Sequence, residues 1–217
     1  MKRVAVILSG SGVFDGTEIH EAVISLLAIR ENGAQYECFA PDMTQLHVIN
    51  HLTGEVADGE SRSVLVESAR IARGSVKPVT ACKVEDFDAL ILPGGFGAAK
   101  NLCTFAIDGP ECKINEDVLA VCKAFANAKK PAGYACIAPV LAAAVYGSGH
   151  KVTIGNDKDT AGGVEELGGS HVDCPVTEII VDANAKLVTT PAYMLASDIL
   201  EAKAGIDKMV ATVLAMA

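Results

Sequence analysis

The sequence predicts an α/β fold in which helices cover both faces of a mostly parallel sheet. Short, continuous apolar runs alternate with helical patterns along the chain, and such runs are typical of strands buried on both faces. The 217 residues contain no segment that resembles a linker, which predicts one domain over residues 1–217. In sheets of this kind the active site lies at the carboxyl ends of the strands, so the turns after strands are the expected functional segments.

Each element has its own signal. The apolar run 4–8 predicts the first strand, and the glycines at 10 and 12 predict the turn after it. Thr17 is the expected N-cap of a helix over residues 17–30, with Glu18 in the first turn and Asn32-Gly33 ending it. The remaining expected elements are strands at 36–40 and 89–92, directly before Cys136, near 152, at 179–181 and at 187–189, a polar loop at 50–54, and helices at 63–72, 116–129, 139–146 and 197–216.

The composition excludes several classes of protein. A formal net charge of −9 argues against nucleic acid or an anionic membrane as a partner, because both need basic patches. The apolar runs are too short to span a bilayer, and residues 1–10 indicate a first strand rather than an export signal, so a cytoplasmic protein is expected. The seven cysteines are odd in number and show no C-x-x-C spacing, which predicts free thiols rather than a zinc site or a disulfide framework.

Cys136 has the clearest chemical signal in the chain. It lies between a short buried strand and a helix that has Pro139 in its first turn. A thiol at this junction points at unpaired backbone N–H groups and at the positive end of a helix dipole, and both favour the nucleophilic thiolate. The alternative is a buried cysteine that only fills space. The strand–turn–helix context favours the reactive thiol.

Two other segments are expected to face this thiol. Gly94 and Gly95 follow a buried strand, and their backbone N–H groups could form an oxyanion pocket, although a simple tight turn is the alternative. Glu18 and Glu21 lie three residues apart at the start of the first helix. A carboxylate beside a thiol can act as a general acid or base. Ordinary complementation of the helix dipole explains the same carboxylates without catalysis, and the residue pattern by itself favours that explanation.

The histidines and the first glycine turn carry weaker signals. The histidines are scattered and no cluster of ligands indicates a metal site, so no metal is expected. His51, in a polar loop, is the best candidate for a Cys–His pair in space, and a surface position is the alternative. The turn at 10–12 lacks the third glycine of the dinucleotide fingerprint, because position 15 is Asp15, so no nucleotide cofactor is expected. Tyr193 follows the final strand, where it either rims the pocket or packs at a helix start.

Five segments together resemble a known family: residues 6–22, 48–55, 93–102, 136–139 and 188–194. On these strings the chain resembles the class I glutamine amidotransferase-like (ThiJ/PfpI) superfamily. More narrowly it is similar to the ElbB-type proteins, named for enhanced lycopene biosynthesis and described as isoprenoid-biosynthesis glyoxalases. The resemblance runs end to end. It implies a three-layer flavodoxin-like sandwich with Cys136 on a nucleophile elbow, and a glyoxalase that converts glyoxal to glycolate without glutathione or an added cofactor.

The chain departs from the wider superfamily directly after this cysteine. Amidotransferases and Pfp-type proteases use a catalytic histidine, which in the proteases is the next residue, whereas this chain has Ile137. This argues against amidotransfer and proteolysis and leaves the Cys–Glu pairing of the Parkinson-linked relatives. Capping favours Glu18 as the partner and spacing back from Gly33 favours Glu21, so the choice stays open. The expected pocket residues are Gly12, His51, Gly94, Gly95, Asn101, Ile137 and Tyr193.

The predicted function is a cofactor-independent glyoxalase that acts on a small dicarbonyl or aldehyde. The Cys136 thiolate would attack an aldehyde to give a hemithioacetal, backbone N–H groups near Gly94, Gly95 and Ile137 would stabilise the oxyanion, and a glutamate would move a proton between the two carbons. The alternatives are a redox-sensing or chaperone-like thiol protein with weak catalysis, and an amidotransferase-like subunit that needs a synthase. A homodimer is expected, because two-fold assembly is common among oligomers.

Overall fold

A computed structural model describes residues 1–217 and places a seven-stranded sheet at the centre of the molecule. The strand order is β3-β2-β1-β4-β5-β9-β8, and β8 alone runs antiparallel to its neighbour. The strands of this sheet are β1 (Arg3–Ile7), β2 (Gln35–Ala40), β3 (Val76–Pro78), β4 (Ala89–Leu92), β5 (Ala132–Ala135), β8 (Ile180–Asp182) and β9 (Leu187–Thr190). The expected mostly parallel α/β sheet is therefore confirmed.

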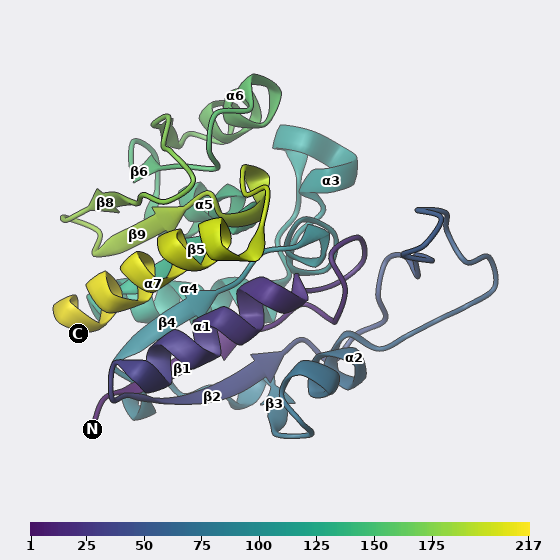
Figure 1. The fold of residues 1–217 in the computed structure, drawn as a ribbon, viewed down its shortest axis with the longest axis horizontal. Coiled ribbons are helices and arrows are strands. Elements are labelled where there is room, and N and C mark those ends of the chain that lie inside the picture. The colour runs from purple at the N-terminus through teal and green to yellow at the C-terminus, as the bar shows by residue number, and fades with distance from the viewer.

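Helices cover both faces of the sheet, as Figure 1 shows. Helices α1 (Ile19–Glu31) and α7 (Ile199–Met216) pack side by side in front of it, and α2 (Val64–Ile71) lies beside α1. Helices α4 (Glu116–Asn127) and α5 (Ala142–Tyr146) contact each other behind the sheet. The centre of the sheet is shielded from water on both faces, because every residue of β4, β5 and β9 is buried. This arrangement explains the continuous apolar runs in the sequence.

The first helix begins at Ile19, two residues later than the sequence predicted. Thr17 is not its N-cap, because the Thr17 hydroxyl accepts a hydrogen bond from the Ser9 backbone N–H at 2.7 Å and so joins the first glycine turn to the helix start. Glu18 is the N-cap instead, and its carboxylate accepts from the Glu21 backbone N–H at 2.6 Å. Glu18 therefore stands before the helix, and Glu21 is the acidic residue of the first turn.

The strand expected near residue 152 is β6 (Lys151–Val152), which pairs with β7 (Ser170–His171) apart from the main sheet. Several short elements were not predicted: β3 at the sheet edge, β7, α3 (Phe105–Asp108) and α6 (Lys158–Glu166). The helix expected at 139–146 is a 3-10 turn, Ala138–Leu141, followed by the five residues of α5. The loop expected around 50–54 is present within an arm, residues 44–63, that projects from the body of the molecule at the right of Figure 1.

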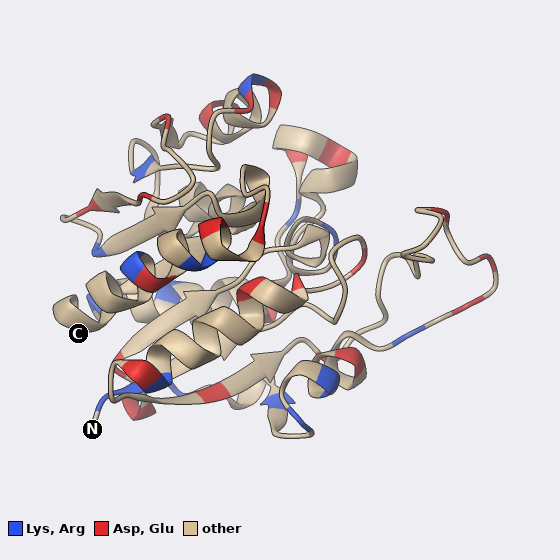
Figure 2. Cartoon of the chain, in the orientation of Figure 1, with Lys and Arg blue, Asp and Glu red and all other residues tan.

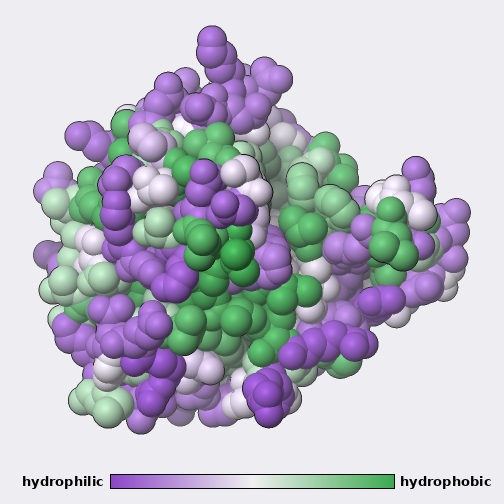
Figure 3. Space-filling model, viewed as in Figure 1, coloured by the Kyte–Doolittle hydropathy of each residue, from purple (hydrophilic) through white to green (hydrophobic).

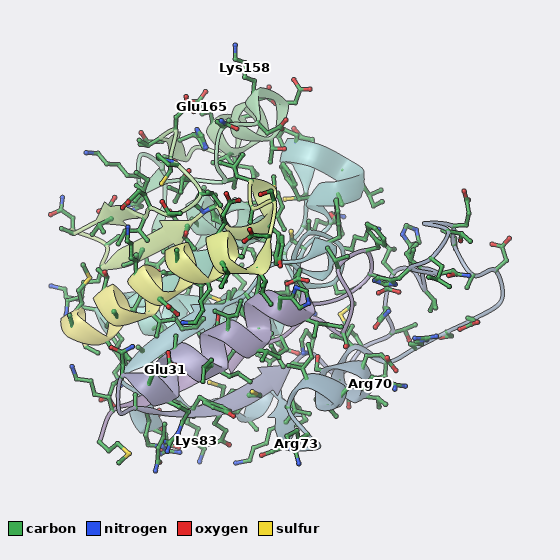
Figure 4. All side chains as sticks on the ribbon, in the orientation of Figure 1. Glu31, Arg70, Arg73, Lys83, Lys158 and Glu165 are labelled. Atoms are coloured by element: carbon green, nitrogen blue, oxygen red, sulfur yellow. The ribbon has the colours of Figure 1, made fainter.

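Acidic and basic residues are scattered over the molecule, without a large patch of one sign in this view (Figure 2). Figure 4 shows the labelled charged side chains pointing away from the core, for example Lys158 and Glu165 on α6. Apolar surface gathers near the middle of the same face (Figure 3). No helix has the length and apolar character needed to cross a membrane.

Candidate active site

Cys136 lies directly after β5, at the carboxyl edge of the sheet. Its φ of +61° is in the left-handed region, which a non-glycine residue adopts at an energetic cost. The neighbouring strand β9 holds Cys136 in this conformation, because the Cys136 N–H donates to the carbonyl of Thr190, the last residue of β9, at 3.0 Å. The 3-10 turn Ala138–Leu141 follows with Pro139 near its start. This sharp strand-to-helix turn has the form of a nucleophile elbow, with the thiol at its apex.

Glu21 is the carboxylate that meets this thiol. Its side chain is fully buried and hydrogen-bonds with Cys136, while its two oxygens accept from backbone N–H groups of Gly94 at 2.8 Å and Tyr193 at 3.0 Å. The two N–H groups come from the turns after β4 and β9, so two segments that are distant in sequence hold the carboxylate beside the sulfur. Glu18 is held away from the thiol by its capping bond.

Burial raises the pKa of both partners. Desolvation and the nearby Glu18 charge together raise the pKa of Glu21 to about 7, against hydrogen bonds from the N–H groups of Tyr193 and Gly94 and from the Cys136 thiol. Desolvation and the Glu21 charge raise the pKa of Cys136 well above its ordinary value, against hydrogen bonds from the backbone N–H groups of Gly95 and Ile137. The expected resting thiolate is therefore wrong, because burial and the neighbouring carboxylate outweigh the backbone donors.

Gly94 has no room for a side chain because it lies against the Cys136–Glu21 pair. A Cβ on Gly94 would lie 2.3 Å from the Cys136 Cβ and 2.8 Å from Glu21 Oε2, so only glycine lets the β4 turn approach the pair. The Gly94 N–H is also occupied by Glu21, which removes it from the expected set of oxyanion donors. The N–H groups of Gly95 and Ile137, which hydrogen-bond the Cys136 sulfur, are the donors that remain there.

A cavity of about 220 Å³ opens onto Cys136. Gly95, Ile137 and Tyr193, three of the expected pocket residues, line it. The other residues that line the cavity are largely apolar and were not predicted from the sequence: Val13, Phe96, Ala99, Phe105, Ala106, Thr160 and Met194. Phe96 and Met194 lie within residues 93–102 and 188–194, two of the segments that resemble the known family. Phe105, Ala106 and Thr160 belong to α3 and α6, which have no clear helical pattern in the sequence.

His51, Gly12 and Asn101 do not line this cavity, contrary to expectation. The Asn101 amide donates to the carbonyls of Ser9 and Asp15 at 2.9 Å each and so braces the loop after β1. His51 Nε2 accepts from the Phe14 N–H at 3.2 Å on the outer side of that loop, and a Cβ on Gly12 would lie 2.6 Å from the same nitrogen. These residues support the loop that places Val13 in the cavity wall, and they do not themselves line the cavity beside the thiol.

The Tyr193 side chain lies at the rim of the cavity, where its hydroxyl hydrogen-bonds with His20 Nδ1 at 2.8 Å. His20 is the residue before Glu21 and is exposed. It is the histidine that the structure brings to the edge of the site, although the sequence pointed to His51. No group of three or more His, Cys, Asp or Glu side chains could hold a metal ion.

Comparison with known proteins places this site in a family. The model of the DJ-1/PfpI family matches residues 2–201. The ES1 protein homolog of Rattus norvegicus is 50% identical over 98% of this chain and 83% of its own, and glutamine amidotransferase-like class 1 domain-containing protein 3 of Homo sapiens is 48% identical over 98% and 82%. Both relatives are named as mitochondrial proteins, which departs in part from the cytoplasmic location expected for this chain.

A solved structure supports the same grouping. The crystal structure of an isoprenoid biosynthesis protein with an amidotransferase-like domain from Ehrlichia chaffeensis is 38% identical, covers 100% of this chain and 99% of its own, and superposes with a TM-score of 0.93. The flavodoxin-like sandwich expected from the resemblance is thereby confirmed.

Proposed function

Because the chain belongs to the DJ-1/PfpI family, we propose that it is a cofactor-independent glyoxalase of the ElbB type, which converts a 2-oxoaldehyde such as glyoxal to a 2-hydroxy acid. The observation that carries the proposal is the buried pair of Cys136 and Glu21 at the mouth of an apolar cavity. A carboxyl group with a pKa of about 7 is suited to both accept and return a proton near neutral pH.

In the first step Glu21 takes the proton of the Cys136 thiol while the sulfur attacks the aldehyde carbon. This coupling removes the need for a resting thiolate, which the raised pKa of the thiol disfavours. The new C–S bond turns the aldehyde oxygen into an oxyanion. The N–H groups of Gly95 and Ile137, which lie on the sulfur, are the proposed donors to it.

Glu21 then returns the thiol proton to the oxyanion, which gives the neutral hemithioacetal and frees the carboxylate. In the second step this carboxylate moves a proton between the two carbons. It takes the hydrogen of the carbon bonded to sulfur and delivers a proton to the neighbouring carbon, so the former hemithioacetal becomes a thioester with an adjacent hydroxyl. Water then cleaves the thioester, which releases the 2-hydroxy acid and restores the Cys136 thiol. The net change is addition of one water to the substrate, with no external oxidant or reductant.

The cavity wall favours substrates with an apolar substituent. Phe96, Phe105 and Met194 offer contacts that the two carbons of glyoxal cannot fill in a space of about 220 Å³. We therefore expect phenylglyoxal to be turned over with a kcat/KM at least equal to that of glyoxal.

The test is turnover by the Cys136→Ala variant. We expect kcat/KM for glyoxal to fall by about 10³-fold or more, because both the covalent step and the proton transfer depend on the sulfur. Glycolate formed by the parent and by the Ala variant is measured by chromatography with free glyoxal as the blank. Equal turnover by the two proteins would rule out the mechanism.

The redox-sensing or chaperone-like alternative has less support at Cys136. The thiol is 7% exposed and its pKa is raised, and oxidants attack exposed thiolates most readily. Negligible glyoxal turnover together with a stable sulfinate at Cys136 after mild peroxide treatment would favour this alternative over the glyoxalase.

A further inference from the structure

We propose that Cys103 and Cys112 form a second thiol site, separate from Cys136, which a peroxide oxidises reversibly to an intramolecular disulfide beside the Cys136 cavity. The site does not depend on the proposed glyoxalase activity. It rests on the fold of the segment 103–114, on the burial of the two thiols and on the place of this segment in the cavity wall.

The segment folds back on itself and brings the two thiols together. Cys103 forms an antiparallel bridge with Ile114, and the Thr104 N–H donates to the Lys113 carbonyl at 3.0 Å. The Lys113 N–H donates in return to the Thr104 hydroxyl at 2.9 Å. This pairing places Cys103 and Cys112 on adjacent stretches of backbone, where their thiols interact. The Cys103 thiol also donates to the Ala98 carbonyl at 3.4 Å, and disulfide closure replaces that bond.

The two thiols differ in burial and in acidity. Cys103 is buried, and the hydrogen bond with Cys112 followed by desolvation raises its pKa. Cys112 is half-buried, and the hydrogen bond from the Cys103 thiol lowers its pKa to about 7. Each of the other cysteines has a raised pKa: Cys38, Cys82, Cys103, Cys122, Cys136 and Cys174. Cys112 is therefore the thiol with most thiolate at neutral pH.

The oxidation takes place in two balanced steps. The Cys112 thiolate attacks one oxygen of the peroxide, the O–O bond breaks, and the products are a sulfenic acid on Cys112 and hydroxide or an alcohol. The Cys103 sulfur then attacks the sulfenic sulfur, and water leaves with the Cys103 proton. The pair loses two electrons, the peroxide gains them, and a small-molecule thiol reverses the reaction by exchange.

The position of the pair couples it to the Cys136 site. Phe105 and Ala106 lie between the two cysteines and line the cavity that opens onto Cys136. A disulfide across this segment restricts the motion of that wall. We expect alkylation of Cys136 by iodoacetamide to slow by about threefold or more once the disulfide has formed, because opening of the wall controls access to a buried thiol.

The chain offers a direct readout of the modification. Trypsin cleaves after Lys100 and Lys113, and peptide 101–113 contains Cys103 and Cys112 as its sole cysteines. The fully reduced protein is treated with increasing amounts of hydrogen peroxide, free thiols are alkylated, and the protein is digested with trypsin. The mass of peptide 101–113 is then measured by mass spectrometry. We expect the peptide to lose the mass of two hydrogen atoms and to escape blocking, before other cysteines react, and to regain both thiols with dithiothreitol.

The matched variants are Cys112→Ser and Cys82→Ser, both at half-buried positions. Cys112→Ser is expected to leave Cys103 open to blocking, while Cys82→Ser forms the disulfide as the parent does. If peptide 101–113 from the parent protein keeps both thiols while other cysteines oxidise, the proposal is overturned. This result does not depend on either variant. An unchanged rate of Cys136 alkylation in the oxidised protein would overturn the coupling to the cavity, whatever the result with glyoxal.

Discussion

Cys136 and Glu21 control each other's protonation, and neither can be understood by itself. Burial raises the pKa of both groups, and the Glu21 charge raises that of the thiol further. Two interacting groups lose their protons in steps that belong to the pair. The first step, near pH 7, leaves one proton shared between sulfur and carboxylate. That singly protonated pair is the state that the proposed reaction uses.

Gly94 provides the residue-scale test of this close approach. Ala at this position would put a methyl group 2.3 Å from the Cys136 Cβ, which is tied to the backbone and cannot swing away. We expect Gly94→Ala to destabilise the fold by about 1–3 kcal/mol and to lower glyoxal turnover by separating thiol and carboxylate. Gly162→Ala is the matched control, since a Cβ there meets no atom within 4 Å. Urea unfolding and turnover of both variants check this, and a fully active, stable Gly94→Ala would contradict it.

Single residues show where the sequence was sufficient and where it was not. Cys136 was identifiable because strand, turn and proline follow one another in the chain. The choice of Glu21 over Glu18 was not, because it depends on N–H groups of Gly94 and Tyr193 that lie far away in sequence. Asn101 and His51 were misplaced for a related reason. A polar side chain beside a glycine loop has the same local pattern whether it braces the loop from outside or faces the ligand.

The start of α1 is the element that sets the position of the carboxylate. Glu18 caps the helix through the Glu21 N–H at 2.6 Å, and the Glu18 N–H donates to the Gly94 carbonyl at 2.9 Å. Cap, helix and β4 turn are thus one hydrogen-bonded unit around Glu21. The Glu18 charge also contributes to the raised pKa of Glu21. Glu18 is therefore a positioning residue rather than one that touches the substrate.

Substitutions at Glu18 separate its two effects. Glu18→Gln keeps a capping oxygen but removes the charge, so we expect the pH at which kcat/KM reaches half its maximum to move below the value of the parent, with stability preserved. Glu18→Ala removes the cap as well and is expected to cost about 1 kcal/mol of folding free energy. The measurements are pH–rate profiles and chemical unfolding. A loss of activity in Glu18→Gln as large as in Glu21→Gln would show that Glu18 has a direct chemical role.

The elements with a clear apolar run or helical pattern were predictable, and those without one were not. The strands β1, β4 and β9 and the helices α1, α4 and α7 follow apolar runs or helical patterns of the expected kind. Helix α3 has four residues and β3 has three, too few to show a period. Helix α6 contains Gly162 and Gly163, which oppose helix formation in isolation. Tertiary packing decides these segments, and two of them carry cavity residues.

On the scale of the whole molecule, the parallel sheet explains why distant segments meet at one place. The strands β1, β4, β5 and β9 end at the same edge, and the turns that follow them supply Val13, Gly94, Cys136 and Tyr193. The sequence supported this convergence because parallel strands point the same way. It did not predict the opposite wall of the cavity, which comes from α3 and α6 outside the sheet.

The face that carries α1 and α7 is where the expected homodimer would form. Ile19, Val23 and Leu27 are spaced by four residues along α1 and are 45%, 49% and 45% exposed, and Leu200 at the start of α7 is 72% exposed. Figure 3 shows apolar surface on this face. An apolar stripe on an exposed helix is typical of a contact with another chain, and a two-fold axis would pack the stripe against its own copy.

Light scattering after size exclusion tests the assembly. We expect the parent to run with the mass of two chains and the double variant Val23→Glu, Leu27→Glu with the mass of one, because charges would be buried at the interface. Glu substitutions at the equally exposed Leu46 and Val56 on the arm are the control and should leave the mass unchanged. A monomeric parent at high concentration would contradict the expected homodimer.

The most direct test of the Cys136–Glu21 pair is the pH dependence of glyoxal turnover measured beside the rate of Cys136 alkylation. Because Glu21 must be ionised to accept the thiol proton, and its pKa is raised to about 7, we expect both rates to rise with pH through about 7 and then level off. In Glu21→Gln turnover should fall by about 10²-fold or more, and the rise in alkylation should move to higher pH, because burial still raises the pKa of the thiol. Turnover that does not change between about pH 6 and 8 within the error of the assay would contradict the role of Glu21 as the base for Cys136. A turnover profile that Glu21→Gln leaves unchanged would contradict it as well.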